Sequence, residues 1–89
     1  MPRVSSAAAA HVGARIKAAR VRYSMTHDEL AASTGIDSSN IRSYESGRAM
    51  LSVVTLVRIA DALATTPGEF LDELTLDLFP AETTARRAG

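Results

Sequence analysis

Histidines and carboxylates, the side chains that most often hold metals or transfer protons, stand in this sequence without the spacing of a catalytic or metal site. His11 and His27 are sixteen residues apart, unlike the short spacings of metal ligands, and we expect a surface role for His11. The acidic residues Asp72, Glu73 and Asp77 have no nucleophile or glycine-rich phosphate loop beside them, so we expect a solvated face there. The chain has no cysteine, which excludes thiolate catalysis and cysteine-based zinc fingers. We therefore predict no enzymatic activity, no cofactor and no metal.

The elements that position the remaining polar side chains are predicted to be helices. Of 89 residues, 46% are hydrophobic but only 4% are aromatic, and this balance favours short, close-packed helices in one all-α domain. No apolar run approaches the roughly 18 residues of a membrane span, so we expect a cytoplasmic protein. We predict a flexible N-terminus over residues 1–6, a helical domain over residues 7–79 and a disordered tail over residues 80–89.

Capping residues place the helix ends. Thr26 and Glu29 form a Ser/Thr-x-x-Glu capping box, which predicts the start of a short helix. Gly35 supplies the left-handed conformation that ends this helix. We expect the Asp37 side chain to cap the next helix by accepting from backbone N–H groups near Ser39. Five helices are predicted, over residues 7–22, 27–34, 38–46, 53–63 and from 67 to about 74.

Apolar spacing marks the faces of the last two helices that should pack. Apolar residues recur at intervals of three and four, which is typical of a helix with one buried face. We assign five of them to the core: Leu56, Ile59, Leu63, Phe70 and Leu71.

Two of the short helices form the pattern that carries the functional prediction. They span residues 27–46 and are joined through Gly35, a geometry that lets one helix brace another across a nucleic-acid backbone. Ala31 is small because the second helix must cross close to it, and Ile36 fills the space under the turn. Ile41 and Tyr44 then point to the core at i, i+3. These positions predict a helix-turn-helix.

Residues 15–74, about two thirds of the chain, resemble the phage lambda repressor and Cro family of DNA-binding domains, also called the XRE family. The resemblance implies a five-helix, lambda-repressor-like bundle with a helix-turn-helix at the second and third helices. It is carried by five segments in order: RIKAAR at 15–20, THDELA at 26–31, TGI at 34–36, IRSYESGR at 41–48 and LVRIADAL at 56–63.

The resemblance also implies which residues contact double-stranded DNA. The third helix is expected to lie in the major groove, where Arg42 could pair bidentately with a guanine and would carry more specificity than the serines. Positions that match base contacts are Ser38, Ser39, Arg42 and Ser43. Positions that match phosphate contacts are Thr26, His27, Asn40, Ser46 and Arg48.

Two further features follow from the same resemblance. The family usually has glutamine where this chain has His27. A histidine can also bind a phosphate, and it binds more strongly when it is protonated. Arg20 and Glu45 match a partly buried ion pair that ties the first helix to the end of the third.

The charge distribution is compatible with one face meeting DNA. The net charge is zero, but residues 1–48 hold seven basic and four acidic side chains, whereas residues 49–89 hold three and six. The low net charge leaves a second hypothesis open, in which the protein is a protein–protein adaptor that kept the fold without DNA binding.

The main hypothesis is a transcriptional regulator that binds a palindromic operator as a homodimer, because one such domain buries little DNA surface. An autoregulatory restriction–modification controller, or the antitoxin of a toxin pair, would suit the absence of a sensor domain. The residues expected to form the dimer surface are Leu71, Leu74, Leu76, Leu78 and Phe79.

Overall fold

A computed structural model describes residues 6–80, and over this range the chain folds into α-helices and one short 3₁₀ helix, as the composition predicted. The predicted flexible start and tail therefore lie outside the described residues, apart from Ser6 and Pro80. None of the described helices is long and apolar enough to cross a membrane. The elements are α1 (Ala7–Arg22), α2 (His27–Thr34), α3 (Ser38–Glu45), α4 (Val53–Ala62), α5 (Pro67–Leu71) and η1 (Leu76–Leu78).

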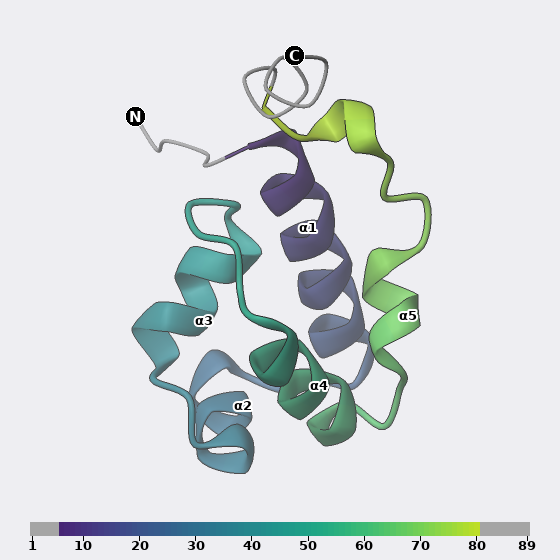
Figure 1. Ribbon diagram of the computed structural model, residues 1–89. Coiled ribbons are helices and arrows are strands. Elements are labelled where there is room, and N and C mark those ends of the chain that lie inside the picture. The colour runs from purple at the N-terminus through teal and green to yellow at the C-terminus, as the bar shows by residue number, and fades with distance from the viewer. Residues whose placement is uncertain (1–5, 81–89) are drawn as a thin grey trace.

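The long helix α1 is the element on which the others assemble (Figure 1). Helices α3 and α5 pack on opposite sides of it, while α2 packs against α3 and α4. The core lies where these helices meet, and its largest fully buried side chains include Phe70, Ile16, Leu30 and Ile41. Burying such side chains contributes about 1.5–3 kcal/mol each relative to exposure, so this cluster is the main source of stability.

The capping box at the start of α2 is confirmed. The Thr26 hydroxyl accepts from the backbone N–H of Glu29 at 3.0 Å, and the Glu29 carboxylate accepts from the backbone N–H of Thr26 at 2.9 Å. Gly35 follows α2 with φ 77°, a left-handed conformation that costs glycine little because it has no Cβ. Interactions between residues close in sequence therefore fix both the start of α2 and the turn that leads into α3.

The cap predicted at Asp37 is wrong in its chemistry. Asp37 does stand at the N-cap position of α3, but its carboxylate makes no hydrogen bond to the backbone. It accepts instead from the Ser39 hydroxyl at 3.3 Å, because that side chain is a competing donor two residues away.

The last helix is shorter than predicted. It ends at Leu71, and two residues later Glu73 has φ 65°, a left-handed conformation that a right-handed helix cannot contain. The turn leaves 42% of Leu71 exposed, so the assignment of Leu71 to the core is wrong, whereas Phe70 beside it is fully buried. The other three predicted core residues, Leu56, Ile59 and Leu63, are buried as expected.

Helices α1 and α3 approach each other unusually closely at Gly13. A Cβ built on Gly13 would lie 2.1 Å from the carbonyl oxygen of Tyr44 and 2.8 Å from that of Glu45. Both atoms belong to the backbone and cannot move aside cheaply. The absence of a side chain at this position therefore determines how α3 sits on α1.

Candidate nucleic-acid interface

The pair α2 and α3 is held as a unit by side chains on both sides of the Gly35 turn. Leu30 of α2 and Ile41 of α3 are fully buried in the core. Three half-buried residues, Ala31, Ile36 and Tyr44, pack against the same cluster. Because one face of α3 is committed to the core, its opposite face is turned outward.

The residues expected to contact bases lie on that outward part of α3. Arg42 and Ser39 are exposed, while Ser38 and Ser43 are half-buried. Arg42 makes no ion pair with any residue between 6 and 80, so its guanidinium keeps its donors available. The arrangement offers hydroxyls and one guanidinium to an acceptor-rich surface.

The residues expected to contact phosphates surround this face. The exposed ones are Thr26, Asn40, Ser46 and Arg48. The Ser46 hydroxyl donates to the carbonyl oxygen of Ser43 at 3.2 Å, and Thr26 is used by the capping box. His27, the remaining member, is half-buried at the first position of α2.

Arg20 and Glu45 form a bidentate ion pair between α1 and the last residue of α3. Arg20 Nε donates to Glu45 Oε2 at 2.7 Å, and Nη2 donates to Oε1 at 3.0 Å. The third guanidinium nitrogen, Nη1, donates to the carbonyl oxygen of Met25 at 2.8 Å. Only 9% of the Arg20 side chain and 5% of the Glu45 side chain are exposed, so the pair is largely desolvated. It locks the orientation of α3 relative to α1.

The environment of Arg20 keeps it charged. The hydrogen bonds that Arg20 donates to Glu45 raise the pKa of Arg20, its burial lowers that pKa, and the negative charge of Glu45 raises it, with a net upward shift. Since the pKa is raised relative to the unfolded chain, the stabilisation is present below the unfolded value and is lost only as pH rises through the folded value. Both values are strongly alkaline, so titration of Arg20 does not weaken the pair near neutral pH.

His27 has a partner that the sequence did not reveal. Its Nε2 lies 3.0 Å from Glu45 Oε1, the same oxygen that accepts from Arg20. The two residues are eighteen positions apart and belong to different helices, so no local spacing could indicate the contact.

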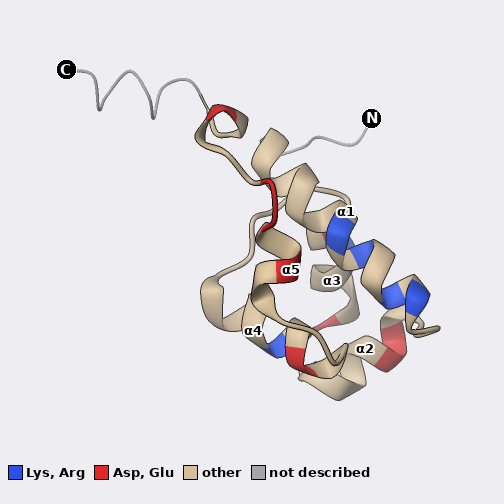
Figure 2. Cartoon of the chain, turned by 90° about the vertical axis from the view of Figure 1, so that its right-hand side faces the viewer, with Lys and Arg blue, Asp and Glu red and all other residues tan. Residues whose placement is uncertain are grey.

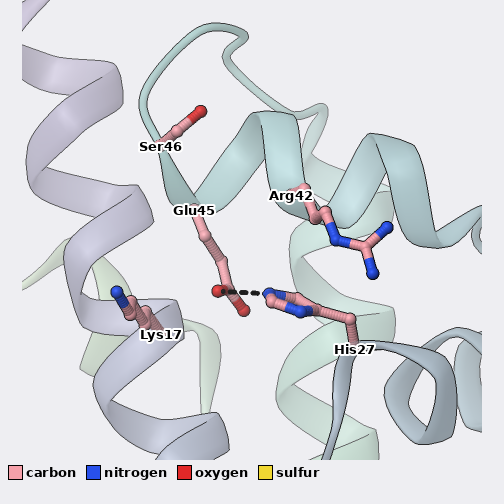
Figure 3. Close-up of a pocket in the computed structure, with 5 residues that line it drawn as sticks. All are labelled: Lys17, His27, Arg42, Glu45 and Ser46. Atoms are coloured by element: carbon pink, nitrogen blue, oxygen red, sulfur yellow. Dashed lines mark hydrogen bonds and ion pairs between the residues drawn. The ribbon is translucent and has the colours of Figure 1, made fainter. Parts of the chain in front are cut away.

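A polar cleft of about 200 Å³ opens where α1, α2 and α3 meet, around this His27–Glu45 contact (Figure 3). Sequence reasoning missed Lys17, which enters the cleft from α1. The side chains that line the cleft are Lys17, His27, Arg42, Glu45 and Ser46.

The charges are divided as the sequence indicated (Figure 2). Lys and Arg gather along α1, whereas α5 and the segment after it carry acidic residues. Arg15 is an exception to the basic surface, because it pairs with the exposed carboxylate of Glu73 at 3.1 Å. Among residues 6–80, no cluster of three or more histidines and carboxylates could hold a metal ion.

The residues expected at a dimer surface are only partly available. Leu71 and Leu76 are exposed, Leu78 and Phe79 are half-buried, and Leu74 packs against the core cluster. An apolar groove of about 200 Å³ lies beside them, and Leu71, Leu74 and Phe79 contribute to its lining.

The beginning of α4 extends this surface. Met50 and Val53 also line the groove, and Val53 is 77% exposed. Val54 and Val57 are exposed on the same helix. Sequence reasoning missed all four residues, although the three valines lie on α4 off the Leu56–Ile59–Leu63 stripe and could have been found from it.

Helices α2 and α3, the turn between them and the outward polar face of α3 define a helix-turn-helix domain. The chain belongs to the helix-turn-helix family, here of the XRE type, whose sequence profile matches residues 16–70.

Several solved structures resemble this one, among them the following two. The restriction–modification controller protein C.AhdI from Aeromonas hydrophila has a TM-score of 0.68 and 27% identity, and the match covers 70% of this chain and 94% of that one. A hypothetical transcription factor, NHTF from Neisseria, has a TM-score of 0.66 and 19% identity over 89% of this chain and 83% of that one, a likeness of fold. No curated protein sequence matches the chain.

Proposed function

We propose that this protein is a cytoplasmic transcriptional regulator that binds a palindromic operator as a homodimer. The observation that carries the proposal is the exposed polar face of α3, which the Arg20–Glu45 pair and the buried Ile41 hold in one orientation. A rigidly held helix with hydroxyl and guanidinium donors suits the major groove, where each base pair presents a distinct set of acceptors and donors. Membership of the helix-turn-helix family supports the same conclusion.

Base readout is assigned chiefly to Arg42. Its guanidinium can donate two parallel hydrogen bonds to guanine, whereas Ser39 beside it can bond to several bases and discriminates weakly. Arg48, exposed beyond the end of α3, is assigned to a phosphate.

A pair of arginine variants tests this assignment. Arg42→Ala should relax sequence preference and cost about 1–3 kcal/mol on the preferred operator, while Arg48→Ala should weaken binding to all sequences alike. The salt dependence of Arg48→Ala should also be shallower, with a log–log slope reduced by about 0.9. Gel shifts on the preferred and a scrambled fragment measure both effects, and identical behaviour of the two variants would contradict the sorting of contacts.

A second copy of the chain is the proposed occupant of the apolar surface formed by the groove and the exposed side chains beside it. Three exposed apolar residues from two separate parts of the chain contribute to it: Val53 at the start of α4, and Leu71 and Leu76 at the end of α5 and the start of η1. A soluble monomer rarely leaves such a patch uncovered. A two-fold dimer would present two copies of α3 to two half-sites, which accounts for a palindrome.

Sedimentation equilibrium tests the dimer. The wild-type protein should have twice the mass of one chain, and Leu76→Asp should shift it to the monomer. Val21→Asp is the matched control. Val21 is also exposed, but it lies in the last turn of α1, whereas the η1 segment that carries Leu76 lies by the first turn of α1 (Figure 1). A monomeric wild-type protein, or equal dissociation by both substitutions, would refute the proposed surface.

Control of its own gene, in the manner of a restriction–modification controller, is the form of regulation we favour. The likeness to C.AhdI, which extends over nearly the whole of that protein, supports it. The test is a gel shift with DNA from beside the chain's own gene. Salt-sensitive binding to that fragment is expected, and absence of binding to any fragment would favour the adaptor instead.

A further inference from the structure

The polar cleft between α1, α2 and α3 contains more positive than negative charge. Lys17 and Arg42 lie on either side of the His27–Glu45 contact (Figure 3), and neither has an ion-pair partner among residues 6–80. Glu45 is the acidic residue of the lining, and its charge is already matched by Arg20. The cleft is therefore suited to receive an anion.

The contact with Glu45 determines what the His27 ring can do. A carboxylate that binds an arginine in two places accepts hydrogen bonds and donates none, so the His27 Nε2 at 3.0 Å must carry the proton. In a neutral imidazole the other nitrogen, Nδ1, then has a lone pair and is an acceptor. Phosphate oxygens of DNA are acceptors too, so neutral His27 cannot hydrogen-bond a phosphate while it holds Glu45.

Protonation removes this conflict. An imidazolium donates from both nitrogens, and can bind Glu45 with one and a phosphate with the other. The family usually has glutamine at this position, and the glutamine side chain does not titrate. A phosphate contact that depends on protonation is therefore a consequence of the histidine.

The charges around His27 couple its protonation to the anion. On α1 it faces Lys17 and Arg20, and on α3 it faces Arg42 and Glu45. Because Arg20 and Glu45 compensate each other, the unmatched charges that remain around the ring are those of Lys17 and Arg42. Asp28 and Glu29, on its own helix, are exposed, and Glu29 is engaged in the capping box. A phosphate in the cleft would reverse the balance.

We propose that this cleft binds one backbone phosphate of DNA and that His27 takes up a proton when it does so. The inference rests on the proposed DNA binding and on the phosphate contact that the family resemblance implies at His27. It adds Lys17 of α1 to that contact, and it adds the hydrogen bond to Glu45 as the reason that His27 needs a second proton. Lys17 contributes a positive charge that is present throughout, and His27 contributes a positive charge only when its ring is protonated.

The experiment is fluorescence anisotropy with a duplex from beside the chain's own gene and a random duplex, at constant ionic strength between pH 5.5 and 8.5. Because each bound protomer would hold one proton more than the free protein, the wild-type affinity should fall by up to about tenfold per pH unit and per protomer as the pH rises. His27→Gln should bind with an affinity that is constant over this range. Lys17→Gln should bind more weakly at every pH and keep the wild-type dependence.

His11→Gln is the matched control. Its ring is also half-buried, but it bonds to the carbonyl oxygen of Asp72 at 2.7 Å, on the side of α1 that faces α5. This variant should keep the full dependence on pH.

Calorimetry of the wild-type protein in two buffers of different ionisation enthalpy gives a readout that needs no variant. It should report one proton taken up per bound protomer, and no uptake would overturn the inference even if His27→Gln fails to fold. A pH dependence unchanged in His27→Gln would overturn it as well. Absence of DNA binding at every pH refutes the proposed function instead, which separates the two failures.

Discussion

The buried ion pair between Arg20 and Glu45 should be worth far more to stability than the exposed pair on the same helix. Replacing Arg20 by methionine removes two hydrogen bonds to Glu45 and one to the Met25 carbonyl oxygen. Methionine has a similar length and a similar helix propensity, so the change isolates the charge and its donors. The Glu45 carboxylate, 5% exposed, would then be left without its principal partner.

The expected loss follows from that burial. Removing one partner of a buried pair typically costs about 3–5 kcal/mol, because the other charge remains desolvated. His27 still contacts Glu45 Oε1 in the variant, so we place the loss near the lower end, at about 3 kcal/mol. For a domain of this size each kcal/mol lowers Tm by about 4–8 °C. Arg15→Met is the control, since Arg15 pairs with Glu73, which is 75% exposed, and should cost at most about 1 kcal/mol.

Urea unfolding followed by circular dichroism measures these differences at neutral pH. The double variant Arg20→Met/Glu45→Met should be more stable than Arg20→Met alone, because it removes the stranded carboxylate. The reasoning would be refuted by a loss below 1 kcal/mol in Arg20→Met. It would also be refuted if the double variant lost as much free energy of unfolding as Arg20→Met and Glu45→Met lose together. Additive losses would mean that the two residues are not coupled.

Two further matched pairs test the packing and the capping. Gly13→Ala should lose about 2 kcal/mol in urea unfolding, because its Cβ would overlap backbone oxygens of Tyr44 and Glu45 and the gain in helix propensity offsets only part of that strain. Gly68→Ala, whose Cβ would meet nothing nearer than 3.9 Å, should be neutral or slightly stabilising, and equal losses at the two glycines would contradict the close approach of α1 and α3. Thr26→Ala should cost about 1 kcal/mol through its lost cap, and Thr66→Ala should cost less because Thr66 makes no side-chain cap hydrogen bond; thermal melts of both compare them.

Much of the fold could be predicted from the sequence because its signals are local. The capping box at Thr26 and the left-handed turn at Gly35 depend on hydrogen bonds and backbone angles within a few residues. The stripe that contains Leu56 and Ile59 depends only on the helical period. A local signal failed where a competing donor was near. The Asp37 carboxylate was predicted to cap α3, but it accepts a hydrogen bond from the Ser39 hydroxyl instead.

The site depended on the tertiary structure to a greater extent. Arg20 and Glu45 are twenty-five residues apart, and only the resemblance to a known family suggested that they meet. Nothing suggested that His27 would join them or that Lys17 would share a cleft with them.

Sequence alone determined which segments are helical, where they begin and which faces are apolar, since these are decided by neighbours along the chain. Tertiary structure decided how the helices cross. The missing side chain of Gly13 lets α3 approach α1 closely enough to bring Glu45 against Arg20 and His27. The tertiary structure also decided that the chain turns after Leu71 and leaves Leu71 exposed on the surface rather than buried in the core. Such contacts join distant residues through packing, and no period or spacing along the chain encodes them.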